Sequence, residues 1–523
     1  MLFSSPEFIY AFLPLVFLGF VLSHRLKSPS AVLYWLIASS LFFYGWWNPR
    51  YLVLIVALIA ANFALSRAIL AAPTAATRKA WLLAGLTLNL GTLVYYKYTG
   101  FLLRNIDALT GAQWTVGTIV LPLGISFFTF QKIAFLVDTY HGRVPRIGFG
   151  EYSLFVLFFP QLIAGPIVHH SEVVPQFRAL HERRMNWDNV AIGVTVFFIG
   201  LFKKVVLADS LSAYDVTPVF SKVAAGAHPA FLEAWGGALG YTLQLYFDFS
   251  GYSDMAIGAA LLFGIRLPQN FNSPYKATSI IDFWRRWHMT LSRFLRDYVY
   301  FPLGGNRLGP GRRYVNLFVT MLLGGFWHGA GWTFVIWGAL HGSYLAINHG
   351  WRALMDRAGV DFSAIPVIVR RSAALLLTFF AVVIGWVYFK SDSTATAARM
   401  LGAMFGANGI ALPLALSHLP LLPTLLGHLS HFVAPDEAYG QLRGSIALLG
   451  IAALLVWCWS LPNALQMFAA QRAALVSSDL ESAPGWSRFH YGWRWATLTA
   501  AVILICLVYV QSNIQQDFLY FDF

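Results

Sequence analysis

The sequence predicts an all-α protein that crosses a membrane many times. Of its 523 residues, 58% are hydrophobic and only 11% are charged, whereas a soluble domain usually carries about 25% charged residues. Apolar runs of about 20 residues, the length of a membrane-spanning helix, recur along the whole chain. No segment has the composition of an inserted soluble module, so we expect one membrane-embedded domain over residues 1–523.

The charge pattern predicts the orientation of the chain. The net charge of +13 does not indicate nucleic acid, because Lys and Arg gather in loops between apolar runs, as cytoplasmic loops require. The first apolar run is followed by basic residues rather than preceded by them, which is the reverse of a secretory signal. We therefore expect a multi-pass membrane protein, surrounded by lipid, with its N-terminus outside the cytoplasm. Arg488 and Arg494 before the last apolar run place the C-terminus there too.

The first half of the chain alternates spans with loops of unlike charge. Basic residues fall on every second loop, and the apolar runs lie near 8–23, 31–47, 51–70, 80–103 and 118–137. The next run, 152–168, contains Pro160 and Pro166. Each proline removes a backbone hydrogen bond, so this run predicts a kinked or re-entrant helix.

Two acidic residues lie in or beside apolar segments in the middle of the chain. After a helix near 189–207, two apolar runs, 231–247 and 255–265, are joined through D-F-S-G-Y-S-D, which carries Asp248 and Asp254. Buried carboxylates are usually paired with a neighbouring Arg or Lys. The alternative is that they orient a histidine or line a catalytic cavity.

Residues 265–313 form the longest basic loop, which its charge places on the cytoplasmic side. Ser279 predicts the start of an amphipathic helix within it. One face carries Trp284, Trp287 and other apolar residues, and the opposite face carries arginines, so we expect the helix to lie in the membrane interface. His288 falls at the edge of the apolar face. Arg285 and Arg286 are expected to bind either lipid phosphates or a phosphate-bearing acyl donor.

Residues 314–347 surround a second histidine in a different setting. His328 lies between apolar runs 314–326 and 331–347, in the sequence M-L-L-G-G-F-W-H-G-A-G-W. The glycines allow a close approach of backbone or substrate, and Trp327 and Trp332 supply flat apolar walls. A lone histidine of this kind often makes only an interhelical hydrogen bond. An ionisable side chain at membrane depth nevertheless indicates function by default. His341 is a weaker candidate on the following helix.

The remainder of the chain adds little chemistry. It predicts helices at 372–389, 444–461 and 495–511, and His418, His428 and His431 follow no metal-ligand spacing. The two cysteines lie in apolar segments and suggest neither a disulfide framework nor a metal cluster. We expect no metal site, no covalently bound cofactor and no nucleotide-binding motif. Histidine is therefore the remaining candidate for catalysis. A neutral imidazole is the usual general base that takes a proton from a hydroxyl.

Several stretches resemble the membrane-bound O-acyltransferase (MBOAT) family. They are N-F-N-S-P-Y-K-A-T-S-I-I-D-F-W-R-R-W-H-M-T-L-S-R-F-L-R-D, G-G-F-W-H-G-A-G-W, P-L-G-I-S-F-F-T-F-Q-K-I-A-F-L-V-D-T-Y, F-F-P-Q-L-I-A-G-P-I-V and D-F-S-G-Y-S-D-M-A-I-G. The resemblance runs over nearly the whole chain and implies that His328 is catalytic and that His288 is its second polar position. It also implies a ring of roughly 11 transmembrane helices, with re-entrant and interfacial helices, around a central tunnel.

The resemblance further implies a reaction and its partners. Its bacterial branch moves acetyl groups from a cytoplasmic donor, acetyl-CoA, across the inner membrane to a periplasmic acetyltransferase or carrier protein. The final acceptor is an exopolysaccharide such as alginate. Alternatives within the family are cellulose, peptidoglycan or D-alanylation of teichoic acid. The alternative from another class of protein is a channel or exporter that catalyses no reaction. The absence of an internal repeat in the sequence argues against it.

Overall fold

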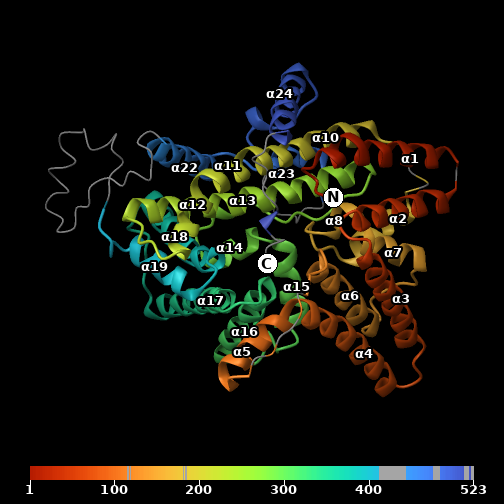
Figure 1. Cartoon of the computed structure of the whole chain (residues 1–523), viewed down its shortest axis with the longest axis horizontal. Helices are drawn as coiled ribbons and strands as arrows, with labels where there is room; N and C mark the ends of the chain where they lie inside the picture. Colours follow the sequence, from red (N-terminus) through yellow and green to blue (C-terminus); the bar gives the residue numbers. More distant parts are fainter. Residues whose placement is uncertain are drawn as a thin grey trace. The chain divides into compact units, whose positions relative to one another are not determined.

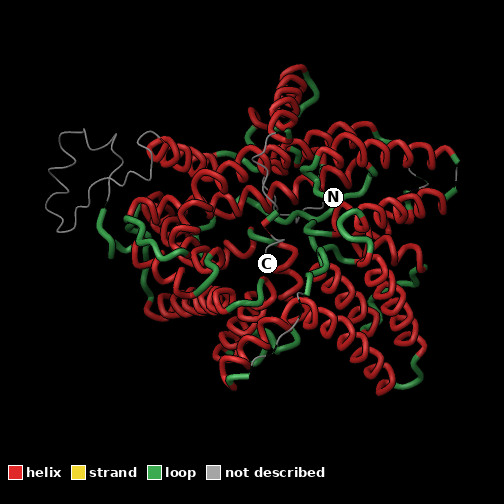
Figure 2. The backbone as a smooth tube through the Cα atoms, viewed as in Figure 1, coloured by secondary structure: helices red, strands yellow, loops and turns green. Residues whose placement is uncertain are grey.

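The computed structural model describes the whole chain except residues 27, 113, 115–116, 118, 181, 183–184, 411–442, 475–482, 512–517 and 520–523. The described residues form helices joined by loops, and no strand is drawn among them (Figure 2). His418, His428 and His431 therefore lie outside the described part. The chain forms two compact units: the first comprises Met1–Phe202, Ser250–Asn270 and Asn463–Ser512, and the second Lys203–Phe249, Phe271–Pro462 and Asn513–Phe523.

The helices of the first unit come mainly from the N-terminal part (Figure 1). They are α1 (Leu13–Arg25), α2 (Pro29–Gly45), α3 (Arg50–Ala71), α4 (Ala75–Leu93), α5 (Thr99–Thr110), α6 (Ile125–Tyr140), α7 (Phe149–Leu157), α8 (Phe159–Leu162), α9 (His170–Arg178), α10 (Trp187–Leu201), α23 (Ala464–Met467) and α24 (Trp493–Val510). Short π-helical stretches extend α1 and α4, as η1 (Glu7–Phe12) and η2 (Val94–Tyr98).

The helices of the second unit include those that carry the predicted histidines. They are α11 (Asp209–Leu211), α12 (Thr217–Ala224), α14 (Ile280–Arg286), α15 (Met289–Leu295), α16 (Pro310–His328), α17 (Trp332–Ala358), α18 (Val367–Lys390), α19 (Thr394–Met404) and α22 (Arg443–Ser460). The long helix α13 (Phe231–Leu262) contributes its first part to the second unit and its last part to the first unit.

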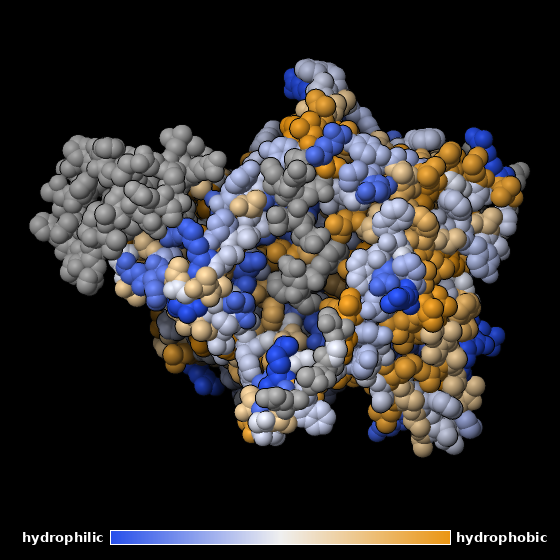
Figure 3. Space-filling model, in the orientation of Figure 1, coloured by the Kyte–Doolittle hydropathy of each residue, from blue (hydrophilic) through white to orange (hydrophobic). Residues whose placement is uncertain are grey.

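Several helices have the length and composition of membrane spans. Among the described residues, five helical segments qualify, namely Glu7–Arg25, Arg50–Ala71, Trp187–Ala224, Val367–Lys390 and Trp493–Val510, and two shorter apolar helices are Ser30–Gly45 and Ala447–Ser460. Large apolar side chains also remain exposed on α1 and α3, such as Leu15, Leu18 and Val53. Hydrophobic residues cover much of the visible surface over these helices (Figure 3), as expected where lipid is the solvent. The predicted all-α membrane protein is confirmed.

The broken helix predicted at 152–168 is present. Helix α7 ends at Leu157, and Phe158 leaves the helical conformation with φ −47° and ψ 108° before the short α8. A Cβ atom at Gly165 would come within 2.5 Å of the Cα atom of Gln161, so the following turn requires glycine. Proline at position 160 therefore interrupts the helical run after α7, and the tight turn at Gly165 follows the end of α8.

The two apolar runs at 231–247 and 255–265 are not separate helices. They belong to the single helix α13, which passes through Asp248 and Asp254 without interruption. The connecting sequence contains no proline, and both aspartates are buried inside the helix rather than placed in a turn. The apolar runs therefore do not form the joined pair that the sequence suggested, because the residues between them continue the helix.

Glycines bring α16 and α17 into close contact in the second unit. A Cβ atom at Gly325 would come within 2.8 Å of the Cα atom of Gly338, and one at Gly342 within 2.9 Å of the Cα atom of Phe318. Small residues at a helix interface let the backbones approach, which is the usual packing solution inside a membrane. This contact fixes the end of α16, where His328 lies.

Candidate active site

His288 occupies a break between two helices. The predicted continuous amphipathic helix was wrong, because α14 ends at Arg286 and α15 begins at Met289. Ser279 does cap α14, since its side chain accepts a hydrogen bond from the backbone N–H of Asp282 at 3.1 Å. The run contains neither proline nor glycine, so tertiary packing rather than local preference imposes the break.

The backbone of His288 lies in the left-handed region, with φ 42° and ψ 53°. This conformation is uncommon for a residue other than glycine and is costly by about 1–3 kcal/mol, so it persists only where the surroundings enforce it. His288 is 0% exposed, rather than at the boundary expected from the helical wheel. The strain therefore serves to turn the imidazole inward.

Aromatic rings surround the imidazole of His288. Its ring centroid lies 4.8 Å from that of Phe249, in an edge-to-face arrangement, and 6.3 Å from that of Trp327. Burial lowers the pKa of His288 to about 3. The side chain is therefore neutral at physiological pH, which is the state in which an imidazole accepts a proton.

His328 is the last residue of α16 and is 4% exposed. Its ring centroid lies 4.8 Å from that of Trp327, 5.1 Å from that of Trp337 on α17 and 5.1 Å from that of Phe389 on α18. Three helices thus enclose it in apolar rings. The flat apolar walls expected from the tryptophan-rich sequence are therefore present around His328.

The structure brings His288 and His328 together. Their ring centroids are 6.5 Å apart, and Trp327 contacts both rings. Both residues belong to the second unit. The sequence placed them in different settings, separated by 40 positions, and gave no indication of this proximity. We call these two residues the histidine pair.

The tryptophans proposed as walls have different surroundings. Trp327 lies within the histidine pair's enclosure, whereas Trp287 is 3% exposed and packs on Trp386, with ring centroids 4.9 Å apart. Trp332 begins α17 and is 56% exposed. The ring of Trp327 thus contacts both histidines.

Asp248 forms part of a buried ionic group in the second unit. Lys204 Nζ lies 2.7 Å from Oδ1 of Asp248 and 2.7 Å from Oδ1 of Asp209, and all three side chains are at most 4% exposed. The backbone N–H of Leu519 donates to Oδ2 of Asp248 at 3.2 Å. The pairing that was expected for a buried carboxylate is therefore present at Asp248. Asp254 is also buried, within the part of α13 that belongs to the first unit.

The two arginines proposed for the donor differ in their availability. Arg286 Nε donates to Oδ1 of Asp282 at 2.8 Å, so this arginine is held in a local ion pair. Arg285 is exposed, and no ion pair with a described residue holds it. Arg285 is therefore the more available of the two for an anion.

A cationic group around His349 was not recognised in the sequence. Arg313 Nη2 on α16 lies 2.9 Å from Nδ1 of His349 on α17. Burial, followed by the charges of Arg313, Arg352 and Arg285, lowers the pKa of His349 to about 4. These three arginines, which we call the arginine cluster, come from separate helices. The packing of α14, α16 and α17 brings these arginines together, and their spacing in the sequence does not predict this.

His341, the weaker candidate on α17, is fully buried. It is 0% exposed, its ring centroid lies 4.7 Å from that of Trp337, and neither ring nitrogen hydrogen-bonds within the described chain. A Cβ atom at Gly385 would lie 2.9 Å from its Nε2 atom. His341 therefore fits tightly against α18, and Trp337 separates it from His328.

Comparisons with known proteins agree with the motifs. Residues 143–388 match the model of the MBOAT, membrane-bound O-acyltransferase family. The chain is 45% identical over 438 residues to a peptidoglycan O-acetyltransferase of Helicobacter pylori, covering 79% of this chain and 81% of that protein. It is 44% identical over 412 residues to a "probable alginate O-acetylase" of Pseudomonas aeruginosa, covering 77% of this chain and 75% of that protein.

Proposed function

Since the chain belongs to the membrane-bound O-acyltransferase family and is thus an acyltransferase, we propose that it moves acetyl groups from cytoplasmic acetyl-CoA across the inner membrane for O-acetylation of an envelope polysaccharide. Both relatives are named for O-acetyl chemistry, which favours acetyl over D-alanyl as the transferred group. The observation that carries the proposal is the 6.5 Å separation of the histidine pair in a dry enclosure.

The histidine pair suits transfer of an acyl group from a thioester to a hydroxyl. His328 acts as general base and takes the hydroxyl proton while the oxygen attacks the thioester carbonyl. The carbon–sulfur bond then breaks, the ester forms, and the proton passes to the departing thiolate. His288 faces the same reacting group as its helper, and the aromatic enclosure excludes the water that would hydrolyse the thioester.

The arginine cluster supports a donor that carries phosphates. Guanidinium groups form paired hydrogen bonds with phosphate oxygens. Arg285 is exposed, Arg352 is exposed and Arg313 is half-buried, so the cluster presents charge at a surface rather than in the core. The positive-inside pattern places this stretch on the cytoplasmic side, where acetyl-CoA is found.

The ring of roughly 11 transmembrane helices around a tunnel belongs to this proposal. The break between α7 and α8 supports it, because non-helical backbone at membrane depth is tolerated only against protein or a wet cavity. A tunnel would let a cytoplasmic donor and a periplasmic hydroxyl meet at one histidine.

The acceptor is proposed to be an exopolysaccharide such as alginate, reached through a periplasmic acetyltransferase or carrier protein. Peptidoglycan is the second candidate, because the Helicobacter pylori relative is named for peptidoglycan O-acetylation, whereas several of the other relatives are named for alginate. A non-catalytic exporter is disfavoured, since membership of an acyltransferase family implies chemistry.

Radiolabelled acetyl-CoA tests the enzymatic step. Purified protein in liposomes should transfer label to an added oligosaccharide or to a co-purified periplasmic partner, and His328→Ala should not. Retention of all label in acetyl-CoA, with every candidate acceptor present, would contradict the proposal. Label on the oligosaccharide without a partner identifies direct transfer, whereas label that requires the partner identifies a relay.

The acceptor polymer is identified in cells that lack the gene. Loss of O-acetyl groups from the exopolysaccharide, measured by mass spectrometry, with peptidoglycan acetylation unchanged, supports the first candidate. The opposite result supports peptidoglycan. Complementation with His328→Ala is the matched control, because it restores the protein without the proposed base.

A further inference from the structure

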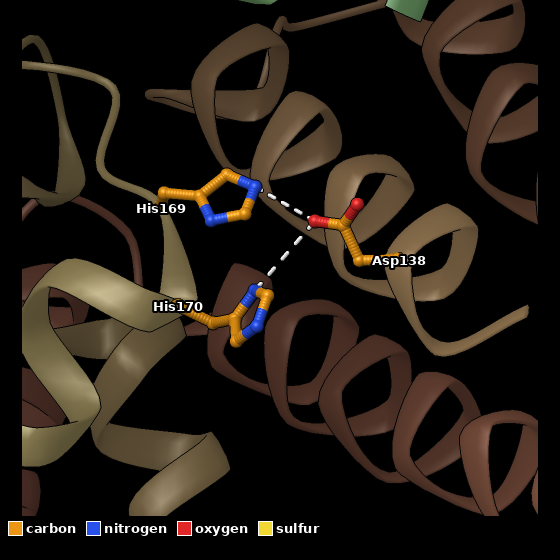
Figure 4. A group of neighbouring side chains, drawn as sticks. All are labelled: Asp138, His169 and His170. Carbon is orange, nitrogen blue, oxygen red and sulfur yellow. Dashed lines mark ion pairs between the residues drawn. The ribbon is translucent and has the colours of Figure 1, made fainter. Parts of the chain in front are cut away.

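Three side chains of the first unit converge far from the histidine pair in sequence. Asp138 lies near the end of α6, and His169 and His170 immediately precede and begin α9. One donor atom from each lies within 4.8 Å of the other two. Figure 4 shows both imidazoles directed at the same oxygen of the Asp138 carboxylate. We call these residues the Asp–His–His cluster.

The distances suit ligands around a shared cation. His169 Nε2 lies 2.7 Å from Oδ2 of Asp138, and His170 Nδ1 lies 3.7 Å from the same oxygen. Tetrahedral zinc with bonds of about 2.0–2.1 Å separates neighbouring ligand atoms by about 3.3 Å. The two observed separations bracket this value, so each nitrogen–oxygen distance needs to change by well below 1 Å, and all three donor atoms already lie within 4.8 Å of one another.

His170 supplies the observation that favours a ligand over an ordinary ion pair. Its side chain is 2% exposed, and Nδ1 makes no hydrogen bond within the described chain. The ring does hydrogen-bond the backbone of Arg143, so this bond uses Nε2. A buried nitrogen without a hydrogen bond costs about 1–3 kcal/mol. A lone pair on Nδ1 that faces a carboxylate oxygen is repelled unless a proton or a metal ion lies between the two, and the 3.7 Å separation is longer than a hydrogen bond.

The surrounding contacts orient the other two donors. His169 Nδ1 lies 2.9 Å from the hydroxyl of Ser171, which leaves Nε2 directed at Asp138. Arg143 approaches the other carboxylate oxygen, Oδ1, at 3.5 Å, and its side chain is 67% exposed. Metal-binding histidines commonly contact such a partner through their second nitrogen. Arg143 and the two imidazoles thus approach different oxygens of Asp138, with both histidines on the side of Oδ2.

Access and donor chemistry narrow the choice of ion. The His169 side chain is 29% exposed, whereas Asp138 and His170 are buried, so the cluster is reached from one side. Two imidazoles and one carboxylate suit zinc rather than magnesium or calcium, which prefer oxygen ligands. We infer that the Asp–His–His cluster binds one zinc ion through His169 Nε2, His170 Nδ1 and Asp138 Oδ2, with an open fourth position.

The ion would join two helices that the chain otherwise connects through a broken segment. Asp138 belongs to α6 and His170 to α9, and the break at Phe158 lies between them. A metal bond between α6 and α9 would stabilise this part of the first unit. Such a site was not expected from the sequence, because adjacent histidines 31 and 32 residues after an aspartate match no metal-ligand spacing.

Elemental analysis of the full chain, purified without a histidine tag, tests the inference. We expect one zinc ion per chain, and a zinc affinity at least about 10-fold lower in His170→Ala. His141→Ala is the matched control, because His141 is an exposed histidine beside the cluster, and it should retain the ion. Zinc content below stoichiometric, or equal in His170→Ala and the native chain, would overturn the proposal. Iron in place of zinc would overturn the identity of the ion.

A second variant keeps the test valid if His170→Ala fails to fold. His169→Cys alters the more exposed ligand and retains a donor for the metal. After replacement of zinc by cobalt, this variant should gain a sulfur-to-cobalt absorption band that the native protein lacks. A cobalt spectrum unchanged by the cysteine would show that residue 169 is not a ligand.

Discussion

Two groups of histidines in this protein show how their surroundings determine their chemistry. The histidine pair, His288 and His328, makes ring contacts with Phe249, Trp327 and other aromatic side chains. In the Asp–His–His cluster, both imidazoles face a carboxylate instead. Apolar surroundings disfavour the charged form of an imidazole and preserve it as a base, whereas a carboxylate attracts a proton or a metal ion.

Burial alone does not identify a catalytic histidine in this protein. His170 and His328 are buried to a similar degree, at 2% and 4% exposure, and His341 is buried completely. What separates them is the neighbouring group: a second histidine near His328, a carboxylate near His170 and aromatic rings around His341. The proposed roles follow from these neighbours.

Replacing His328 should produce the largest effect. His328→Ala removes the proposed general base, which typically contributes about 10²–10⁴-fold to the rate, so acetyl transfer should fall by about 10³-fold. The measurement is label transfer from acetyl-CoA by protein present at the native level in the membrane. His228→Ala is the control, because His228 is an exposed histidine of the same unit. A His328→Ala protein that transfers at the native rate would refute the catalytic assignment.

Replacing His288 separates its chemistry from its backbone strain. Asparagine tolerates the left-handed conformation better than most residues, so His288→Asn should keep the break between α14 and α15. We expect acetyl transfer to fall by about 10–100-fold with the thermal midpoint nearly unchanged. A large loss of stability together with activity would show that His288 is chiefly structural, and unchanged transfer would remove it from the site.

The arginine cluster should affect donor binding more than the chemical step. Arg285→Gln removes one exposed charge, so the KM for acetyl-CoA should rise about 3–10-fold while kcat changes little. The rise should diminish at high salt, because exposed charges are screened. Arg307→Gln changes an exposed arginine of the same basic stretch and should leave KM unaltered. An equal response of the two variants would argue for general membrane electrostatics.

The sequence predicted the helical class for physical reasons. Long apolar runs specify membrane helices, and the proline at position 160 specifies a broken one, so these features required no tertiary information. His328 was also recognisable, since an ionisable residue between apolar helices is costly and demands a reason.

The remaining features depend on contacts between distant segments. The break at His288 has no local signal and arises from packing of Trp287 and His288. Lys204 pairs with Asp248 across 44 positions, and Arg313 meets His349 only because α16 and α17 pack closely. The Asp–His–His cluster likewise joins α6 to α9. The hydrophobic periodicity and residue spacing of a single helix contain no information about contacts between residues on different helices.

Chelation provides the smallest expected effect and the sharpest contrast between the two histidine groups. If the Asp–His–His cluster holds zinc between α6 and α9, treatment with a chelator should lower the thermal midpoint by a few degrees, since loss of a ligand bound only by the folded state reduces stability. Acetyl transfer below that midpoint should change less than about 2-fold, because the proposed base in the histidine pair acts without a metal. His170→Ala should show the lower midpoint before chelation and no further decrease after it. Complete loss of transfer on chelation, restored by zinc in the native chain but not in His170→Ala, would show that the two groups are coupled and that the first unit's metal supports the chemistry of the second.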